Sequence, residues 1–442
     1  MISLLWQQLF RWLAIGIVAA LVLDGLAMSA FAGTEGDGGF DGEAANDAWA
    51  DRSAAPGEVQ QPAPVAMMQD DDDDDDDDVC EIELEAGAAA GSDGYCADQV
   101  ITRLIPGIDA NAVNADFGTE TIAVIEGRSL YLLRLPENSE ETDFAARLER
   151  DDRVRWAELN FIDQAPEGSP RRFYLRANDA VPVASDLDRA YAPELVGAPS
   201  ALACVSGSGV TVAVIDSGFD PDHPAFADTP MDAKDAWNAF SDQDGFGNVD
   251  DIGNSEDDDG DGLIDEMTGH GTHVSGIIVQ VAPDAALMPI KALDSDGIGQ
   301  AFYLARAIYR ALDRNADVIN LSLGSTADTR VVREATGDAM DAGIFVAAAA
   351  GNSGPQGPRE YPATLDRVFG VAATDAQDRP AEFSSVHASL DLSAPGDGIV
   401  SAFALDQPPS NPLGSPYAPR SRTSTATPWV AGAAAPLTAQ NP

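Results

Sequence analysis

Three polar residues that lie far apart along the chain have types that together could cleave an acyl bond. Asp216 ends the apolar stretch GVTVAVID, His270 lies in GHGTHVSG, and Ser424 lies in TSTATPWVAG, in that order. In a hydrolytic triad a histidine takes the proton of a serine nucleophile and a carboxylate orients the histidine, and Asp, His, Ser is one of the known orders. Each residue also has a plainer interpretation: Asp216 could cap a turn, His270 could lie in the core, and Ser424 could cap a helix.

An acidic loop just before the histidine motif is a second candidate site. In DDDGDGLIDE, Asp257, Asp259 and Asp261 stand at alternate positions before a glycine, and Asp265 follows at the ninth position. Carboxylates at positions 1, 3, 5 and 9 of a tight loop can surround a hard cation, although the glutamate that an EF-hand has at position 12 is Thr268 here. The spacing predicts a structural calcium ion, and a solvated acidic loop is the alternative.

The elements around these residues alternate between buried strands and helices. AFYLARAIYRALDR has Leu304, Ala305, Ile308 and Leu312 on one helical stripe. The alternation predicts a doubly wound α/β fold with a parallel sheet covered on both faces, in which function gathers at the carboxyl ends of the strands. The runs that predict strands are GVTVAVID, ALMPIKAL, DVINLSLG, GIFVAAAAG and VFGVAATD.

Residues 99–161 have a different pattern, which predicts a small α+β, ferredoxin-like domain. QVITRLIP, TIAVIEG, RSLYLLRLP and VRWAELNF have strand-like spacing, with the short helical stretches DANAVNADFG and ETDFAARLERDD between them. The order β-α-β-β-α-β is that of a split βαβ sandwich. The polar segment QAPEGSPRR that follows is expected to be a loose connection.

The N-terminal 78 residues are expected to lie outside the folded domains. Residues 1–32 combine Arg11, the apolar run Trp12–Leu23 and an A-x-A site, which predict a signal peptide, with an uncleaved anchor as the alternative. Residues 33–78 end in an unbroken aspartate run and predict a disordered acidic linker. The mature protein is then expected to be secreted or periplasmic, without a membrane helix.

Charge and cysteine content limit the partners. The formal net charge of −49 disfavours nucleic acid and anionic lipid, both of which need cationic contacts. Cys80 and Cys96 are separated by fifteen residues, and a disulfide between them would contribute about 3 kcal/mol in an oxidising compartment. Cys204 is left over and is expected to be buried. A monomer is expected.

Five motifs in order resemble those of the subtilisin-like serine proteases, the subtilases. They are VAVIDSG, GHGTHVSG, AAAAGNSG, FSS with LDLSAPG, and TSTATPWVAG, and the resemblance runs from about residue 190 to the end of the chain. It implies that Asp216 orients His270, the general base, and that Ser424 is the nucleophile. Asn352, which could otherwise sit in a Gly-Asn turn, is implied as the oxyanion-hole donor.

The resemblance also implies where substrate and propeptide bind. Ser322, Leu323 and Gly324 on one side, and Ala350 and Gly351 on the other, correspond to the two segments that flank the substrate cleft. Such edges bind an extended peptide as an added strand, and their small neutral residues suggest an apolar or permissive first pocket.

Residues 79–165 correspond to an inhibitory propeptide that assists folding, ahead of a catalytic domain at 190–442; a permanent accessory domain is the alternative. Polypeptide substrates and the chain's own propeptide are therefore the expected partners.

Several residues depart from the family pattern. Arg422 replaces the glycine that usually stands two residues before the nucleophile, and Ala225 replaces a calcium-binding aspartate of many relatives. Pro436 falls inside the helix that should follow Ser424, where proline costs about 3 kcal/mol. The chain ends eighteen residues after Ser424. These departures motivate an alternative function, a catalytically impaired subtilase that binds calcium or peptide.

Overall fold

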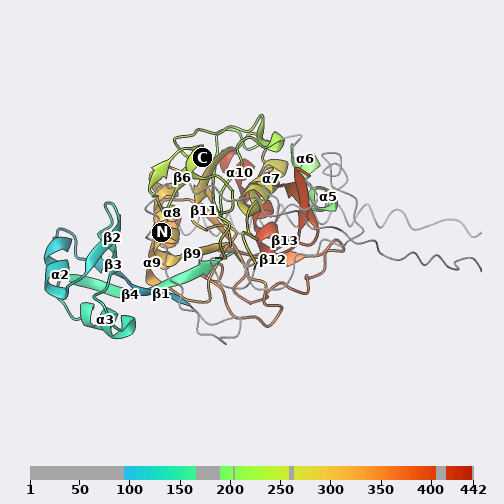
Figure 1. Ribbon diagram of the computed structural model, residues 1–442. Coiled ribbons are helices and arrows are strands. Elements are labelled where there is room, and N and C mark those ends of the chain that lie inside the picture. The colour runs from blue at the N-terminus through green and yellow to red at the C-terminus, as the bar shows by residue number, and fades with distance from the viewer. Residues whose placement is uncertain (1–93, 166–189, 203–204, 258–262, 405–414, 441–442) are drawn as a thin grey trace, which may run out of the picture. The chain divides into compact units, whose positions relative to one another are not determined.

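The computed structural model describes residues 94–165, 190–202, 205–257, 263–404 and 415–440 (Figure 1). The predicted signal peptide and acidic linker lie outside these residues. Among the described residues, no helix has the length and apolar character needed to cross a membrane. The helices are α2 (Ala110–Phe117), α3 (Glu141–Leu148), α5 (Tyr191–Leu195), α6 (Ala198–Leu202), α7 (His270–Val281), α8 (Ala301–Asp313), α9 (Arg330–Asp341) and α10 (Thr423–Gln440). The strands are β1 (Tyr95–Leu104), β2 (Glu120–Ile125), β3 (Leu130–Arg134), β4 (Val154–Gln164), β5 (Thr211–Asp216), β6 (Trp237–Asn238), β7 (Gln243–Asp244), β8 (Ala286–Lys291), β9 (Ile298–Gln300), β10 (Val318–Leu321), β11 (Phe345–Ala349), β12 (Phe369–Thr374), β13 (Leu392–Pro395), β14 (Ile399–Ala402) and β15 (Tyr417–Arg420).

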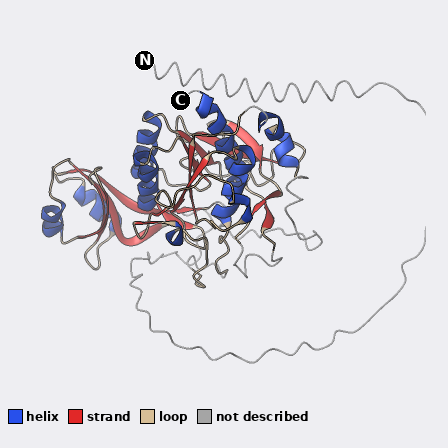
Figure 2. Ribbon diagram, turned by 90° about the horizontal axis from the view of Figure 1, so that it is seen from above, coloured by secondary structure: helices blue, strands red, loops and turns tan. Residues whose placement is uncertain are grey.

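The largest sheet confirms the predicted α/β fold. Its strand order is β13-β12-β11-β10-β5-β8-β6-β7, and all pairs are parallel except β6 with β7. Crossovers through helices connect the central strands, and Figure 2 shows these helices packed around the sheet. The carboxyl ends of β5, β10 and β11 therefore meet at one edge, as the sequence predicts.

Alternation along β5 explains why both faces of this sheet are covered. Ala213 and Ile215 belong to a core with the apolar faces of α8 and α9. Val212 and Val214 point the other way, into a core with α7 and α10. Since successive side chains of a strand face opposite sides, an uninterrupted apolar strand needs helices on both faces.

Residues 95–164 form the predicted β-α-β-β-α-β unit. Its antiparallel sheet has the order β2-β3-β1-β4, and α2 and α3 cover one face through Val113, Phe144 and Leu148. The caps of α2 are readable in the sequence, because the Asp109 side chain accepts the N–H of Asn111 and the helix ends at a left-handed glycine.

The last strand of this unit runs beyond its predicted end. β4 continues to Gln164 and pairs antiparallel with β9, so the sheet gains a strand from the α/β part of the chain. The start of the supposedly loose connection is thus an ordered strand. Sequence alone predicted a loop there because the hydrogen-bond partners are distant residues.

Candidate active site

A buried hydrogen bond joins the first two candidate residues. Asp216 is the last residue of β5 and His270 the first of α7, and the His270 Nδ1 to Asp216 Oδ1 distance is 2.6 Å. The side chains are 0% and 1% exposed. Because a carboxylate can only accept, Nδ1 carries the proton and donates, which leaves Nε2 as the basic nitrogen. The geometry gives His270 the tautomer that a general base requires.

Two glycines let the start of α7 approach the end of β5. A Cβ on Gly271 would lie 2.1 Å from the carbonyl oxygen of Gly218, which only a glycine avoids. Gly269 precedes His270 with a φ of 81°, in the left-handed region that glycine adopts readily. The glycines of GHGTH are therefore explained by close backbone contact around the histidine.

Asp251 holds this junction together and was missed by sequence reasoning. One carboxylate oxygen accepts the Ser217 hydroxyl at 3.1 Å, and the other accepts the Thr272 hydroxyl at 2.7 Å and its N–H at 3.1 Å. A carboxylate that accepts bonds from the first turn of α7 also faces the positive end of the helix dipole. Nothing in the sequence separates Asp251 from the other aspartates around it, since only its burial distinguishes it.

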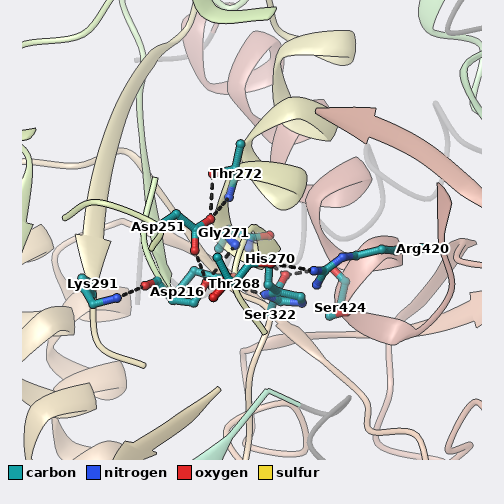
Figure 3. A network of polar contacts seen from close by, with 12 residues as sticks. Asp216, Asp251, Thr268, His270, Gly271, Thr272, Lys291, Ser322, Arg420 and Ser424 are labelled. Atoms are coloured by element: carbon teal, nitrogen blue, oxygen red, sulfur yellow. Dashed lines mark hydrogen bonds and ion pairs between the residues drawn. The ribbon is translucent and has the colours of Figure 1, made fainter. Parts of the chain in front are cut away.

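Lys291 is a second missed residue beside the candidate site. It ends β8, and its ammonium donates to the Ser217 carbonyl oxygen (Figure 3). Burial lowers the pKa of Lys291, while the carboxylates of Asp251 and Asp216, among others nearby, oppose that shift. The lysine places positive charge close to the two buried aspartates.

Ser424 lies in the first turn of α10 and is 0% exposed. Its carbonyl oxygen accepts the hydroxyl of Ser322 at 2.8 Å, and Asn320 Nδ2 donates to that hydroxyl oxygen at 3.0 Å. In Figure 3 the imidazole of His270 lies between Asp216 and Ser424. The three predicted triad residues are thus brought together from β5, α7 and α10.

Asn352 is fixed in one orientation by the residue before Ser424. Its Oδ1 accepts the N–H of Thr423 at 2.9 Å and the Thr423 hydroxyl at 3.0 Å. This leaves Nδ2 buried and without a hydrogen-bond partner among the described residues. A buried donor without an acceptor is costly, and it is therefore suited to an oxygen that arrives with a ligand.

The two segments expected to bind substrate follow neighbouring strands. Ser322–Gly324 come directly after β10, and Ala350 and Gly351 come after β11. Gly324 already pairs with an extended peptide, because its N–H and carbonyl oxygen each bond to Gln164 at 2.9 Å. The edge predicted to bind an added strand therefore binds the end of β4.

The acidic loop is described only in part, since residues 258–262, with Asp259 and Asp261, lie outside the described residues. Asp257 is exposed. Asp265 is buried, and its carboxylate accepts the N–H groups of Asn254 at 2.7 Å and Ser255 at 3.0 and 3.3 Å. The described residues include no group of three metal-binding side chains. Asp265 therefore closes the loop through backbone amides.

Arg422 and Pro436, two residues at which the sequence departs from the family pattern, are both described by the structure. The guanidinium of Arg422 lies over the Phe383 ring, 5.3 Å from its centre. α10 contains Pro436 and continues to Gln440, so the proline does not end the helix. Cys96 is disulfide-bonded, while Cys80 and Cys204 lie outside the described residues, so the Cys80–Cys96 pairing stays a prediction.

Comparisons with known proteins agree with this geometry. The family model described as the subtilase family matches residues 207–442. Thermitase of Thermoactinomyces vulgaris is 34% identical over 262 residues, covering 57% of this chain and 83% of thermitase. An intracellular serine protease of Paenibacillus polymyxa is 35% identical over 255 residues, 55% of this chain and 70% of that protein.

A solved structure supports the fold. Fervidolysin from Fervidobacterium pennivorans, a keratinolytic enzyme related to subtilisin, superposes with a TM-score of 0.61 at 21% identity. The superposition covers 81% of this chain and 56% of the fervidolysin chain. The chain belongs to the subtilase family, the family of subtilisin-like serine endopeptidases.

Proposed function

We propose that this protein is a secreted serine endopeptidase made as a zymogen, with Ser424 as nucleophile. His270 Nε2 takes the Ser424 proton as the hydroxyl oxygen attacks the scissile carbonyl carbon, and it returns the proton to the leaving amine. Water then attacks the acyl-enzyme by the same route and releases the acid. Asp216 stabilises the imidazolium through the 2.6 Å bond.

Charge that develops on the carbonyl oxygen needs a fixed donor, and Asn352 Nδ2 is the candidate. Thr423 holds the amide through its Oδ1, and Nδ2 has no acceptor among the described residues. The start of α10 adds the partial positive charge of a helix N-terminus at the same place. A preorganised donor of this kind stabilises the transition state without reorganisation during the reaction.

Two observations carry the proposal: the buried bond between His270 and Asp216, and an Asn352 Nδ2 that has no hydrogen-bond partner among the described residues. They disfavour the alternative of a catalytically impaired binding protein, which would not need these groups to be preorganised.

A fluorophosphonate probe tests the proposal on the matured protein. Wild type and Ser421→Ala should be labelled, since Ser421 bonds to Asp397 and Gly398 in an exposed loop. Ser424→Ala and His270→Ala should lose both labelling and peptide hydrolysis, because triad members act as a unit. Labelling that persists in Ser424→Ala would refute the assignment.

Contacts between residues 95–165 and the α/β part support an inhibitory propeptide. The Glu158 carboxylate accepts the N–H groups of Arg330 and Val331 at 2.8 Å each, and so caps α9, which has no side-chain cap of its own. Asn160, 0% exposed, donates to Gln300 at 2.8 Å and accepts the N–H of Phe302 at 3.2 Å. This unit therefore satisfies polar groups that the α/β part would otherwise leave open.

Two measurements test the zymogen. The intact mass of the secreted protein should show loss of the residues before about 190. A chain that starts at Ala190 should refold slowly alone and faster when residues 79–165 are supplied, and the added segment should inhibit the folded enzyme. Equal refolding with and without the segment, together with no inhibition, would support a permanent accessory domain instead.

Calcium is proposed as a structural ion of the acidic loop. Of the described ligand candidates, Asp257 is exposed and could bind a cation. Asp265 fits less well, because two backbone N–H groups already use part of its acceptor capacity. A bound ion would hold this loop just ahead of the histidine motif, and no catalytic step depends on it.

A further inference from the structure

The end of β4 lies between two edges of the α/β part of the chain. β4 pairs antiparallel with β9 on one side, and Gln164 pairs with Gly324 on the other. The next residue, Ala165, donates its N–H to the carbonyl oxygen of Gly297 at 2.8 Å. The segment is therefore an extended peptide with backbone partners on both sides, as an added substrate strand would be.

Met267 lies against the same glycine as Ala165. A Cβ built on Gly297 would lie 2.6 Å from Cγ of Met267 and 3.2 Å from Cβ of Ala165. The two side chains belong to one hydrophobic core, and both residues are 0% exposed. A closely packed interior has no free space for additional methylene groups. The Ala165 methyl group therefore occupies a space that Met267 helps to limit.

The backbone of Met267 is held on two sides. Its N–H donates to the carbonyl oxygen of Ser295 at 2.9 Å, and its own carbonyl oxygen accepts the N–H of His270 at 2.9 Å. Ser295 stands two residues before Gly297, so Met267 is fixed between the edge that binds β4 and the catalytic histidine. Only a rotation of the flexible methionine side chain could make room for a larger neighbour.

The pairing also gives the place of Ala165 relative to a scissile bond. Gln164 lies opposite Gly324, so in an antiparallel pair the peptide position two residues further along lies opposite Ser322. The Ser322 hydroxyl donates to the carbonyl oxygen of Ser424 at 2.8 Å. A substrate that binds as β4 does would present its reacting carbonyl at that position. The substrate residue in the place of Ala165 is then the second residue before the scissile bond.

We infer that Met267 restricts this second residue of the substrate to a small side chain, alanine or glycine. The inference rests on the proposed function and specifies its substrate class. A leucine at this position would have to displace Met267 or separate the peptide from Gly297, and overpacking of this kind is destabilising. The chain's own strand meets the restriction, because it has alanine there.

Amide hydrogen exchange on the full-length Ser424→Ala chain tests the contact without peptide hydrolysis. Ala165→Leu should lower the protection of the N–H groups at 164 and 165 about 30-fold, within the usual cost of overpacking. Adding Met267→Ala should restore most of this protection, because the shorter side chain makes room for the leucine. Gln164→Leu is the matched control and should keep the protection, since successive side chains of a strand point to opposite faces. Protection that Ala165→Leu leaves unchanged, or that Met267→Ala does not restore, would overturn the inference.

Hydrolysis of peptides by the matured protein tests the substrate class. The two substrates are tetrapeptide p-nitroanilides that differ only in the next-to-last residue, alanine or leucine. Wild type should have a kcat/KM about 30-fold higher for the alanine peptide, and Met267→Ala should remove most of this difference. Met340→Ala, which shortens a methionine of the same core on α9, is the control and should leave the ratio unchanged. Equal alanine-to-leucine ratios in wild type and Met267→Ala would contradict the inference.

The two experiments separate the inference from the proposed function. If Met267→Ala restores protection to the Ala165→Leu chain while wild type hydrolyses neither peptide, the contact is supported and the proposed function is refuted. If wild type hydrolyses both peptides equally well, the proposed function is supported and the restriction by Met267 is refuted.

Discussion

Asp163 should make the binding of β4 to the substrate-binding edge depend on pH. It pairs with Gly299 of β9, is 3% exposed, and its Oδ2 has no hydrogen-bond partner within the described part of the chain. The flanking segments, β9 and Ser322–Gly324, carry no ionisable side chain. Burial alone raises the pKa of Asp163 from 3.8 to about 7.

The direction of this pH dependence follows from the linkage between protonation of Asp163 and binding of β4. The pKa is higher when β4 is bound than when its carboxyl is in water, so bound β4 holds a proton that free β4 releases. Binding is therefore strongest at low pH and weakens as the pH rises through about 7. With a free value of 3.8 and a bound value of about 7, the affinity falls on the order of 100-fold between pH 5 and pH 8, about 2.7 kcal/mol.

Amide hydrogen exchange on the full-length Ser424→Ala chain measures this directly, because the chain cannot cleave itself. The N–H groups of Gln164 and Ala165 bond to the carbonyl oxygens of Gly324 and Gly297, so their protection reports strand release. After correction for the intrinsic pH dependence of exchange, protection should fall on the order of 100-fold from pH 5 to pH 8.

Asp163→Asn should keep that protection nearly constant, since an amide does not titrate. Asp313→Asn serves as the control, because Asp313 is exposed and pairs with Arg128 between the same two parts of the chain. Two results would show that the Asp163 carboxyl does not govern release of β4. In the first, the corrected amide protection stays constant with pH in the parent chain. In the second, it still falls in Asp163→Asn.

Four further outcomes are expected. Asn352→Ala should lower kcat about 10²–10³-fold with little change in KM, the loss that removal of an oxyanion donor causes in subtilisin, a relative; steady-state kinetics would contradict the role if kcat held. Glu158→Gln should weaken the α9 cap and raise the inhibition constant of the added segment, with a cap worth about 1 kcal/mol. Calcium at 100 times its dissociation constant should add about 2.7 kcal/mol to the free energy of unfolding, and Asp257→Asn should remove this gain. Asp265→Asn should lower the melting temperature both with and without EDTA. Equal melting temperatures of wild type in calcium and in EDTA would exclude the ion. Arg422→Gly should raise kcat/KM on neutral peptides and reduce any preference for acidic ones, and unchanged kinetics would indicate that its contact with Phe383 keeps the guanidinium out of the cleft.

The elements that could be predicted are those whose signal is local. The β-branched runs that became β5, β8, β10, β11 and β12 were recognisable because a strand covered on both faces is apolar throughout. The β-α-β-β-α-β unit was recognisable from the strand-like spacing of four runs and from the two short helical stretches between them. Short strands such as β6 and β9 carry too few residues for either pattern, and they exist through pairing with distant segments.

Charged residues of the candidate site also divide into those with a local sequence signal and those without one. Asp216 and His270 could be predicted because their motifs contain the glycines that the junction needs. Asp251 and Lys291 could not, since a buried aspartate or a half-buried lysine looks like a surface one in the sequence until its neighbours are known. The end of β4 escaped prediction for a related reason, because its partner Gly324 lies far away along the chain.

The contacts at Gly324 also bear on how the cleft distinguishes its own strand from a substrate. Backbone pairing with Gly324 and Gly297 is available to any extended peptide, so it cannot discriminate between them. Discrimination must come from side chains. Asp163 weakens the bound strand once it ionises. Raising the pH toward neutrality would then favour exchange of the chain's own strand for a substrate, without any change in the backbone edge that both use.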